Sequence, residues 1–497
     1  MKTQTPVLSR ARDARSQLAS AAMLQHSTFS VKPLQAVHDE KACNSGGLQR
    51  HLGMWSLMAI GIGATVGAGI FVLSGVAAHD AGPAVVIAFL FAGIACTFSA
   101  LAYAEMSAAL PVTGSAYTYT FATLGEGFAW LVGWNLLLEY ALGASLVARG
   151  FSGYCAALLK DIGVTLPTWS VNGPLEGGIV DLSAVIIVLI MSVIVTLGIR
   201  ECARCTAAMV VLKLLAVGAV ILIGATRINP QNWTPFVAEG WGAVFKSTAL
   251  VFLAFVGFDI VSSTAAEVRN PGRDLPRGIL GTLVICTVLY CLMAGTLTGM
   301  VPYKEIDPAS PITSAFEAVQ MPFVGGIIAV GALVGMASVL LAVLIGLPRI
   351  LMAMARDGLV PIWAAKVHPR TGTPIMTTII ATVVVSLSAG LLPIGAIASL
   401  TGVGTLTAFA AVCASVVVLR AREPDLPRPF RVPGPRWISF VGTLICLALI
   451  LQLLPSLWLP LLMWMSLGAA IYALYGYRNS TLRRATAARN SSNMSTS

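Results

Sequence analysis

Charged residues are scarce in this chain of 497 residues. They make up 10% of the sequence, against 57% for the hydrophobic residues, and the mean hydropathy is +0.84. A soluble domain needs roughly a quarter of its residues charged, so the composition excludes a soluble globular protein. The net charge of +10 gives no indication of a nucleic-acid partner, because the basic residues collect in the segments between long apolar runs.

Histidines and paired cysteines are also scarce, which limits the chemistry open to the chain. The nine cysteines are scattered, and Cys202 and Cys205 form a C-x-x-C pair with no second pair nearby, so incidental thiols are favoured over a zinc or redox site. The five histidines lie outside the interiors of the apolar runs, which argues against a histidine proton relay: His26, His38, His51, His79 and His368. We therefore expect no catalytic site, no metal and no cofactor.

Apolar runs near 20 residues long recur through the whole sequence. Runs of this length cross a bilayer as helices, whereas the strands of an outer-membrane barrel are roughly 10 residues long and alternate in polarity. The sequence therefore predicts an all-α polytopic membrane protein with twelve transmembrane helices. We place the spans at residues 55–78, 84–110, 127–158, 179–198, 205–226, 243–265, 278–300, 323–354, 374–392, 396–419, 437–454 and 457–477.

Lysine and arginine are distributed unequally between the two sides of the predicted bilayer. With twelve spans both termini lie on one side, which carries 25 of the 31 basic residues, against three on the other. Because cytoplasmic loops carry the excess of basic residues, we predict multi-pass insertion in the cell membrane with cytoplasmic termini. Residues 1–50 and 479–497 are then cytoplasmic tails, and residues 422–435 form a cytoplasmic linker.

The first span contains five glycines within residues 58–75 (MAIGIGATVGAGIFVLSG). A membrane span tolerates an interrupted helix only where the freed backbone faces protein, water or a ligand, so we predict a break and a binding site near Thr65. Carbonyl groups at one end of the break suit an ammonium, and N–H groups at the other suit a carboxylate, which together match an α-amino acid. The carbonyl end comprises Ile62, Gly63 and Ala64, and the N–H end comprises Gly67, Ala68 and Gly69.

The sixth span repeats this anomaly. Residues 252–259 (FLAFVGFD) place Gly257 in mid-membrane and predict a second break between Ala254 and Gly257, with Phe252 and Phe255 as candidates to line or cover the pocket. Two interrupted spans five helices apart are typical of an inverted-repeat transporter, which weighs against the alternative of a glycine-rich helix-packing face. We assign the two repeats to residues 51–226 and 241–421, and the last two spans to 436–478.

Lys213 and Glu139 are charged side chains in the middle of predicted spans. A mid-membrane ammonium is costly unless it has a partner or a role, so we assign Lys213 to proton coupling, together with Glu139, or to pinning the carbonyl end of the broken first helix. The alternative is a fixed ion pair with Glu139. Two further roles are open to Glu139: it lines the pocket, or it binds a cationic side chain of the ligand.

Two carboxylates lie nearer to the helix ends than Glu139 does. These are Glu105, in the second span, and Asp259, just beyond the second break. The turn after the sixth span carries Arg269, Arg273 and Arg277. We predict that the carboxylates form a cytoplasmic gating network with these arginines, Arg273 among them.

Five stretches of the chain form a recognisable set: GIGATVGAGIFVLSG, YAEMSAALPVTGSAYTYTFATLGE, GWNLLLEYALGASLVARGFSGY, FVGFDIVSSTAAEVRNPGRDLPRGI and LPRILMAMARDGLVP. Together they resemble the amino acid–polyamine–organocation superfamily, and more narrowly its cationic amino acid transporter branch in a bacterial form. The resemblance covers about residues 50 to 365.

The resemblance implies the five-plus-five inverted-repeat fold of the leucine transporters, with discontinuous helices one and six and two extra helices. It implies that residues 67–69 take the substrate carboxylate, and that carbonyl groups of residues 62–64 and 252–255 take its amino group. By motif position, Lys213 matches a lysine thought to replace sodium in proton-coupled relatives, and Glu139 matches the glutamate of an L-E-Y motif.

We therefore expect a proton-coupled amino acid permease that works by alternating access. Its partners are an amino acid, cationic or neutral, and the lipid bilayer. An exchanger without net proton coupling is one alternative, and a sensor that binds an amino acid without moving it is another. A membrane enzyme is disfavoured, because no histidine lies within a span and no nucleophile and base are suitably arranged.

Overall fold

The computed structural model describes residues 52–484 apart from 112–114, 198, 266–267, 309, 367, 369–372 and 435–436, together with residue 31. Every regular element in this part of the chain is a helix, and Leu52 and Val268 form an isolated β-bridge. The predicted N-terminal tail, apart from residue 31, and the C-terminal tail beyond residue 484 lie outside the described residues.

The helices follow one another with short connections. In chain order they are α3 (Met54–Thr65), α4 (Ala68–Phe71), α5 (Leu73–Ala81), α6 (Val85–Ala109), α7 (Ser115–Thr123), α8 (Glu126–Asp161), α9 (Leu182–Leu197), α10 (Ile199–Ala225), α11 (Gly240–Val251), α12 (Ile260–Ser263), α13 (Pro271–Met300), α14 (Pro311–Ala318), α15 (Pro322–Arg356), α16 (Ile375–Leu391), α17 (Ile394–Arg422), α18 (Trp437–Ile471) and α19 (Tyr477–Asn479). The 3₁₀ turns are η1 (Gly82–Ala84), η2 (Thr168–Ser170), η3 (Pro174–Glu176), η4 (Pro230–Trp233), η5 (Phe252–Phe255), η7 (Tyr303–Glu305) and η8 (Ile362–Ala365), and η9 (Tyr472–Gly476) is a π-helical turn.

Proline marks the start of several helices. Pro271, Pro311 and Pro322 are the first residues of α13, α14 and α15. The fixed φ of proline suits this position, and its missing N–H removes a donor that has no partner in the first helical turn. The short helices α7 and α14 were not expected from the sequence, because neither is long enough to read as a span.

Nine segments within the described residues are long and apolar enough to cross a bilayer, and α3, α9 and α16 are shorter apolar helices. Large apolar side chains are exposed along several of these helices, for example Val193, Leu222 and Ile327. Such exposure suits contact with lipid rather than water. A multi-pass helical membrane protein is therefore confirmed, whereas the count of twelve spans stays a prediction.

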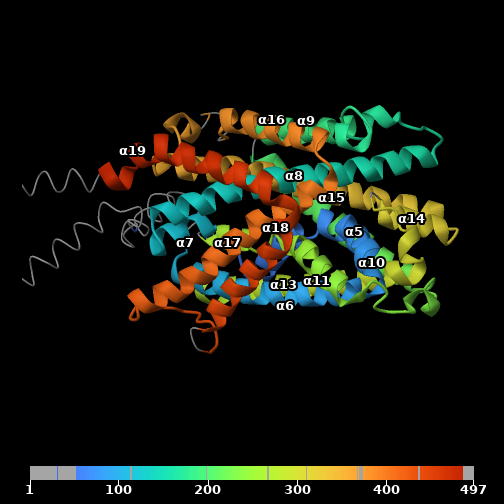
Figure 1. Ribbon diagram of the computed structural model, residues 1–497, viewed down its shortest axis with the longest axis horizontal. Coiled ribbons are helices and arrows are strands. Elements are labelled where there is room, and N and C mark those ends of the chain that lie inside the picture. The colour runs from blue at the N-terminus through green and yellow to red at the C-terminus, as the bar shows by residue number, and fades with distance from the viewer. Residues whose placement is uncertain are drawn as a thin grey trace, which may run out of the picture.

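The central helix of the bundle is α8, which packs on α15 and α17. Figure 1 shows α9 and α16 together along one edge of the molecule, with α6 and α13 along the opposite edge. The pairs α9–α16 and α6–α13 are in contact, and α13 also packs on α3. The interrupted segments α3–α5 and α11–α12 thus lie beside the long helices α6, α8 and α13.

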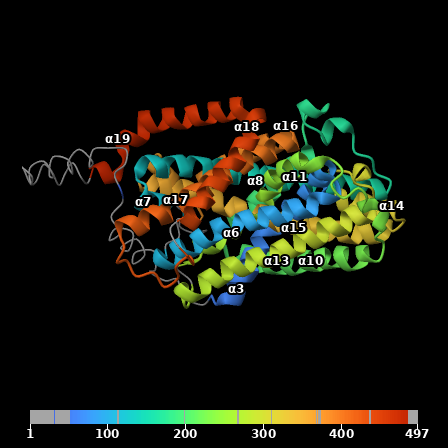
Figure 2. The same cartoon turned by 60° about the horizontal axis from the view of Figure 1, so that its bottom comes forward.

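The last two predicted spans, residues 437–454 and 457–477, are not separated by a loop. The backbone stays helical from Trp437 to Ile471, with Pro455 and Pro460 inside α18. A proline within a helix removes one hydrogen bond and bends the axis without always ending it. Figure 2 shows the red ribbon of α18 in two arms that meet at an angle.

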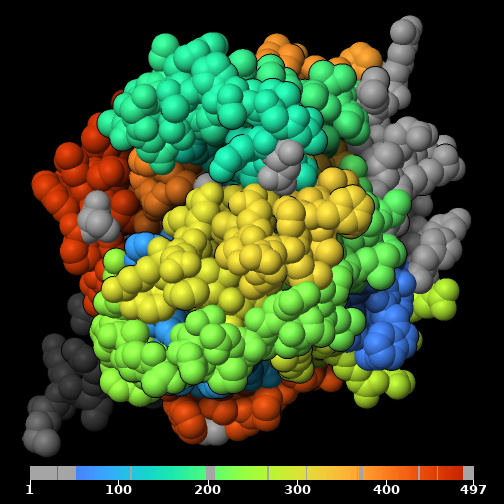
Figure 3. Space-filling model, turned by 90° about the vertical axis from the view of Figure 1, so that its right-hand side faces the viewer, coloured from blue at the N-terminus to red at the C-terminus, as the bar shows by residue number. Residues whose placement is uncertain are grey.

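The end of the molecule that carries α14 is covered by loops. Figure 3 looks onto this end, where the teal loop after α8, yellow α14 and the green segment around residues 226–240 lie together. The loop after α8 is held by Asp181, which accepts hydrogen bonds from Arg149 at 2.8 Å and Ser152 at 2.6 Å. Arg149 also pairs with Glu176, so this loop is fastened to α8 by buried charges.

Candidate functional site

The first predicted break is present. Helix α3 ends at Thr65, and Val66 is extended (φ −76°, ψ 96°). Gly67 leaves the helical path (φ −152°, ψ −135°) before α4 begins at Ala68. The break therefore falls within the glycine-rich stretch that predicted it.

The second predicted break is also present, and it spans residues 256–259. Turn η5 ends at Phe255, and Gly257 has φ +126°, a conformation open to glycine but strained for other residues. The Gly257 N–H donates to Asp259 Oδ1 at 3.0 Å. Asp259 thus stabilises the irregular backbone of its own segment just before α12.

The two breaks touch each other. A methyl group added at Gly257 would lie 2.6 Å from the Thr65 nitrogen, and one added at Gly69 would lie 2.6 Å from Ala254 Cα. Both positions need glycine, because any side chain would collide with main-chain atoms of the other helix. The glycines predicted to form the site therefore also let the two broken segments meet.

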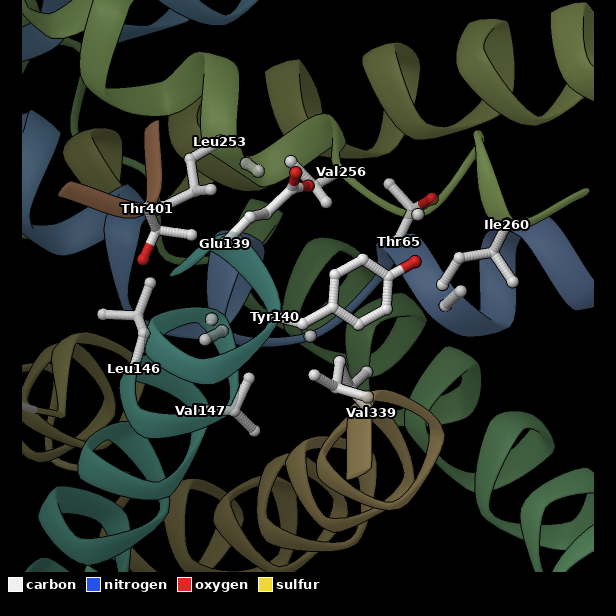
Figure 4. Close-up of a pocket in the computed structure, with 18 of the residues that line it drawn as sticks. Thr65, Glu139, Tyr140, Leu146, Val147, Leu253, Val256, Ile260, Val339 and Thr401 are labelled. Atoms are coloured by element: carbon white, nitrogen blue, oxygen red, sulfur yellow. The ribbon is translucent and has the colours of Figure 1, made fainter. Parts of the chain in front are cut away.

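A cavity of about 80 Å³ lies at this meeting point, which is room for several water molecules. Its walls come from both breaks and from α8, α15 and α17: Ala64, Thr65, Gly67, Ala68, Gly69, Leu73, Glu139, Tyr140, Gly143, Leu146, Val147, Leu253, Ala254, Val256, Gly257, Asp259, Ile260, Val339, Val343 and Thr401. Figure 4 shows the Glu139 side chain extending from α8 toward Val256, and the Tyr140 hydroxyl directed toward Thr65 and Ile260.

Four residues predicted to form the site do not line this cavity. Phe255 packs edge-on against Tyr290 with ring centroids 5.1 Å apart, and Phe252 packs against Phe409 at 5.8 Å. Both rings are fully buried, so the expectation that they line or cover the pocket is corrected: they fill the apolar core behind the second break. Ile62 and Gly63 lie one turn before the first break, outside the cavity wall.

Lys213 reaches the end of the first half-helix from α10. Its side chain is completely buried, and Nζ donates to the Gly63 carbonyl and, at 3.2 Å, to Ser338 Oγ. Among the described residues it forms no ion pair, so the alternative of a fixed pair with Glu139 is not realised. Lys213 instead holds a carbonyl group near the break, two residues before α3 ends.

Glu139 is buried in the cavity wall with little to stabilise its charge. Neither carboxylate oxygen has a hydrogen-bond partner within the described part of the chain. Thr405 is a neighbour of Glu139 that could donate to it, but its hydroxyl donates to the Thr401 carbonyl at 3.2 Å instead. Asp259 lines the same cavity and acts on Glu139 as a like charge. The cavity therefore contains an unsatisfied acceptor suited to a proton or a cation.

The predicted gating residues do not form a common network. Glu105 is buried and accepts from Arg420 Nε at 2.8 Å and from the Val432 N–H at 2.7 Å, with Arg428 3.6 Å away. Its partners are therefore in α17 and the following linker, and the expected pairing with the arginines after the sixth span is wrong. Arg273 is exposed, and the described residues give it no ion pair.

Several residues of the site were missed by sequence reasoning. Tyr140, Leu146 and Val147 line the cavity on the same face of α8 as Glu139. Their helical spacing from Glu139 was a usable signal. Val339 and Thr401 come from α15 and α17, and no local pattern marks them.

Within the described residues no group of three or more His, Cys, Asp or Glu side chains could hold a metal ion.

Comparison with known proteins gives the family. Residues 52–471 match the family model described as amino acid permease. The branched-chain amino acid permease BcaP of Bacillus subtilis is 42% identical over 92% of this chain and 99% of its own length. The methylthioribose transporter of the same organism is 39% identical over 92% of this chain and 100% of its own. The vacuolar cationic amino acid transporter 4 of Arabidopsis thaliana is 37% identical over 79% of this chain and 67% of its own.

These relatives are transporters and not enzymes, which agrees with the expectation from the sequence. The resemblance read from the five motifs is likewise confirmed by the family match. The chain therefore belongs to the amino acid permease family, within the amino acid–polyamine–organocation superfamily.

Proposed function

We propose that this permease is a proton-coupled symporter that carries α-amino acids across the cell membrane by alternating access. The observation that supports it best is the contact between Lys213 and the Gly63 carbonyl. A buried ammonium at this position holds the end of the broken first helix through a charge-assisted hydrogen bond. Loss of the proton leaves a neutral amine that still donates, but through a weaker bond, which links protonation to movement of the break.

The two interrupted segments support an inverted repeat of five plus five helices within twelve spans. Segments α3–α5 and α11–α12 occupy corresponding positions in residues 51–226 and 241–421. A site at the meeting point of two discontinuous helices is the pattern of inverted-repeat transporters. The excess of basic residues in alternate loops supports cytoplasmic termini in a plasma or inner membrane.

The breaks also suggest how the substrate is held. Residues 67–69 and Ala254 line the cavity with little or no side chain, so main-chain N–H and carbonyl groups are within reach of a small ligand. Thr65 adds a buried hydroxyl without a partner among the described residues. These groups match the carboxylate and amino group that every α-amino acid carries.

The cavity wall favours an aliphatic side chain. Its aliphatic residues include Leu146, Val147, Leu253, Val339 and Val343. Burial of a branched apolar side chain among them is favourable, because apolar surface is removed from water. The 42% identity to a branched-chain permease supports the same class. A cationic substrate is the second candidate, favoured by the unsatisfied Glu139 carboxylate and by the cationic amino acid transporters among the relatives.

Uptake by the purified protein in liposomes tests the proposal. With a pH gradient that is acidic outside, labelled L-leucine is expected to accumulate above its external concentration, and a protonophore is expected to abolish the accumulation. L-Arginine measured in parallel decides between the two substrate classes. Exchange of internal for external amino acid that proceeds equally well without a gradient would favour the exchanger instead.

A further inference from the structure

Tyr290, which the sequence did not single out, lies behind the point where the two broken segments meet. It belongs to α13 and is completely buried. Its hydroxyl lies 2.9 Å from the Thr65 carbonyl oxygen and 2.8 Å from the Ala254 carbonyl oxygen. Thr65 ends the first half-helix and Ala254 lies in η5 of the other segment, so one hydroxyl joins the two breaks.

The Thr65 and Ala254 carbonyl groups lack the main-chain donor that a continuous helix would provide. In an uninterrupted helix each would accept from the N–H four residues later, but Val66, Gly67, Val256 and Gly257 leave the helical path. A tyrosine hydroxyl carries a single proton, so the two oxygens share it. The hydroxyl cannot swing aside, because the Tyr290 ring packs against Phe255 at 5.1 Å and Phe89 at 5.5 Å.

We propose that Tyr290 is a positioning residue that fastens the two broken segments into one unit and sets the spacing between the main-chain groups of the two breaks that line the cavity. The inference rests on the proposed transport function. Tyr290 does not line the cavity, so it acts on the substrate only through Thr65 and Ala254. The close contacts at Gly69 and Gly257 bring the segments together, and the shared hydroxyl holds them at that distance.

A second buried tyrosine provides a matched control. Tyr103 of α6 is fully buried among Tyr119, Phe258 and Phe409. Its hydroxyl has no hydrogen-bond partner among the described residues. Tyr103→Phe and Tyr290→Phe therefore make the same chemical change in the same kind of aromatic surroundings, and only the second change removes a link between the breaks.

The affinity of the purified variants for L-leucine and L-arginine tests the proposal. Loss of one hydrogen bond that orients a buried carbonyl is expected to weaken binding roughly tenfold in Tyr290→Phe, whereas Tyr103→Phe is expected to bind as the parent does. The apparent unfolding temperature of each ligand-free variant is measured alongside. A lowered unfolding temperature with an unchanged dissociation constant would mean that Tyr290 only supports the fold, and this would overturn the proposal.

Hydrogen exchange in the unmodified protein gives a second test that needs no variant. If the segments act as one unit, backbone amides of residues 62–70 and 252–258 gain protection together, at the same amino acid concentration. Protection of one segment alone, or at clearly different concentrations, would contradict the proposal even if Tyr290→Phe did not fold.

The inference and the proposed function fail in different ways. Binding that weakens in Tyr290→Phe, in a protein that never accumulates amino acid under a pH gradient, supports the positioning role and contradicts symport. Accumulation by the parent with equal affinities in the parent and Tyr290→Phe supports symport and overturns the positioning role.

Discussion

Two buried carboxylates on α8 have opposite surroundings. Glu126, at the start of the helix, accepts hydrogen bonds from Tyr472 and Arg483, both at 2.9 Å, and from Ser480. Glu139 lies further along the same helix in the cavity wall, where the described residues offer its oxygens no hydrogen bond. A buried charge without partners is costly, so the contrast separates a carboxylate that anchors the structure from one that is left open for a proton or a ligand.

The same contrast separates the charged side chains at one end of the bundle from those in its middle. Near α7, Arg420 and Arg428 surround Glu105, and Arg483 reaches Glu126. In the middle of the bundle Lys213 has only a carbonyl and a hydroxyl for partners, and Glu139 has neither. Saturated ion pairs at one end are suited to a fixed structure, whereas sparsely bonded charges beside the breaks can change protonation without dismantling it.

The largest effect is expected from Lys213→Met. Methionine fills much of the lysine volume but cannot donate to the Gly63 carbonyl, so pH-driven accumulation in liposomes is expected to be lost completely while some substrate binding remains. Lys246→Met is the matched control, because that lysine is largely exposed and pairs with Asp80 on the surface. Accumulation by Lys213→Met at the parent's level would show that neither the charge of Lys213 nor its hydrogen bond to Gly63 is needed for coupling.

Arg420→Met tests the region in which Glu105 is fully paired with arginines. This change leaves the Glu105 carboxylate buried with the Val432 N–H and the more distant Arg428. Breaking a buried pair is expected to lower the free energy of unfolding by about 3–5 kcal/mol, seen as a lower unfolding temperature and a poor yield. Arg422→Met, at the exposed end of the same helix, is the control, because it removes a hydrogen bond to the Thr123 carbonyl at 2.8 Å but breaks no ion pair among the described residues. Equal stability of both variants would remove the basis for calling this region an anchor.

A pair of conservative changes on α8 tests the comparison directly. Glu139→Gln removes an unpartnered charge, so the unfolding temperature is expected to stay the same or rise. Glu126→Gln weakens the contact with Arg483 and is expected to cost about 3 kcal/mol of stability. In the binding assay, Glu139→Gln is expected to reduce the affinity for L-arginine more than that for L-leucine. A similar loss of stability in both variants would contradict the distinction between the two carboxylates.

The sequence predicted those features of the site that depend on local residue types. Both breaks follow from glycines inside apolar runs, and Lys213 stands out because an ammonium is rare in a span. The partners of buried charges could not be predicted, since Glu105 meets Arg420 and Val432 across more than 300 residues of chain. Tyr290 was missed for the same reason: its carbonyl partners at Thr65 and Ala254 belong to other helices.

The smallest effect is expected at Arg273, the gating candidate that the structure leaves exposed. Its side chain is in no ion pair with the described residues, and surface charges of this kind contribute roughly 0–1 kcal/mol. Arg273→Ala is therefore expected to change the unfolding temperature and the rate of L-leucine uptake little, in contrast to Arg420→Met. A large fall in uptake without loss of stability would show instead that Arg273 acts in a conformation other than this one, where it meets Asp259 or another carboxylate. That result would restore the gating network predicted from the sequence. It would also add a transient ion pair to the fixed ion pairs of Glu105 and Glu126 and to the charge of Glu139, which is unpaired among the described residues.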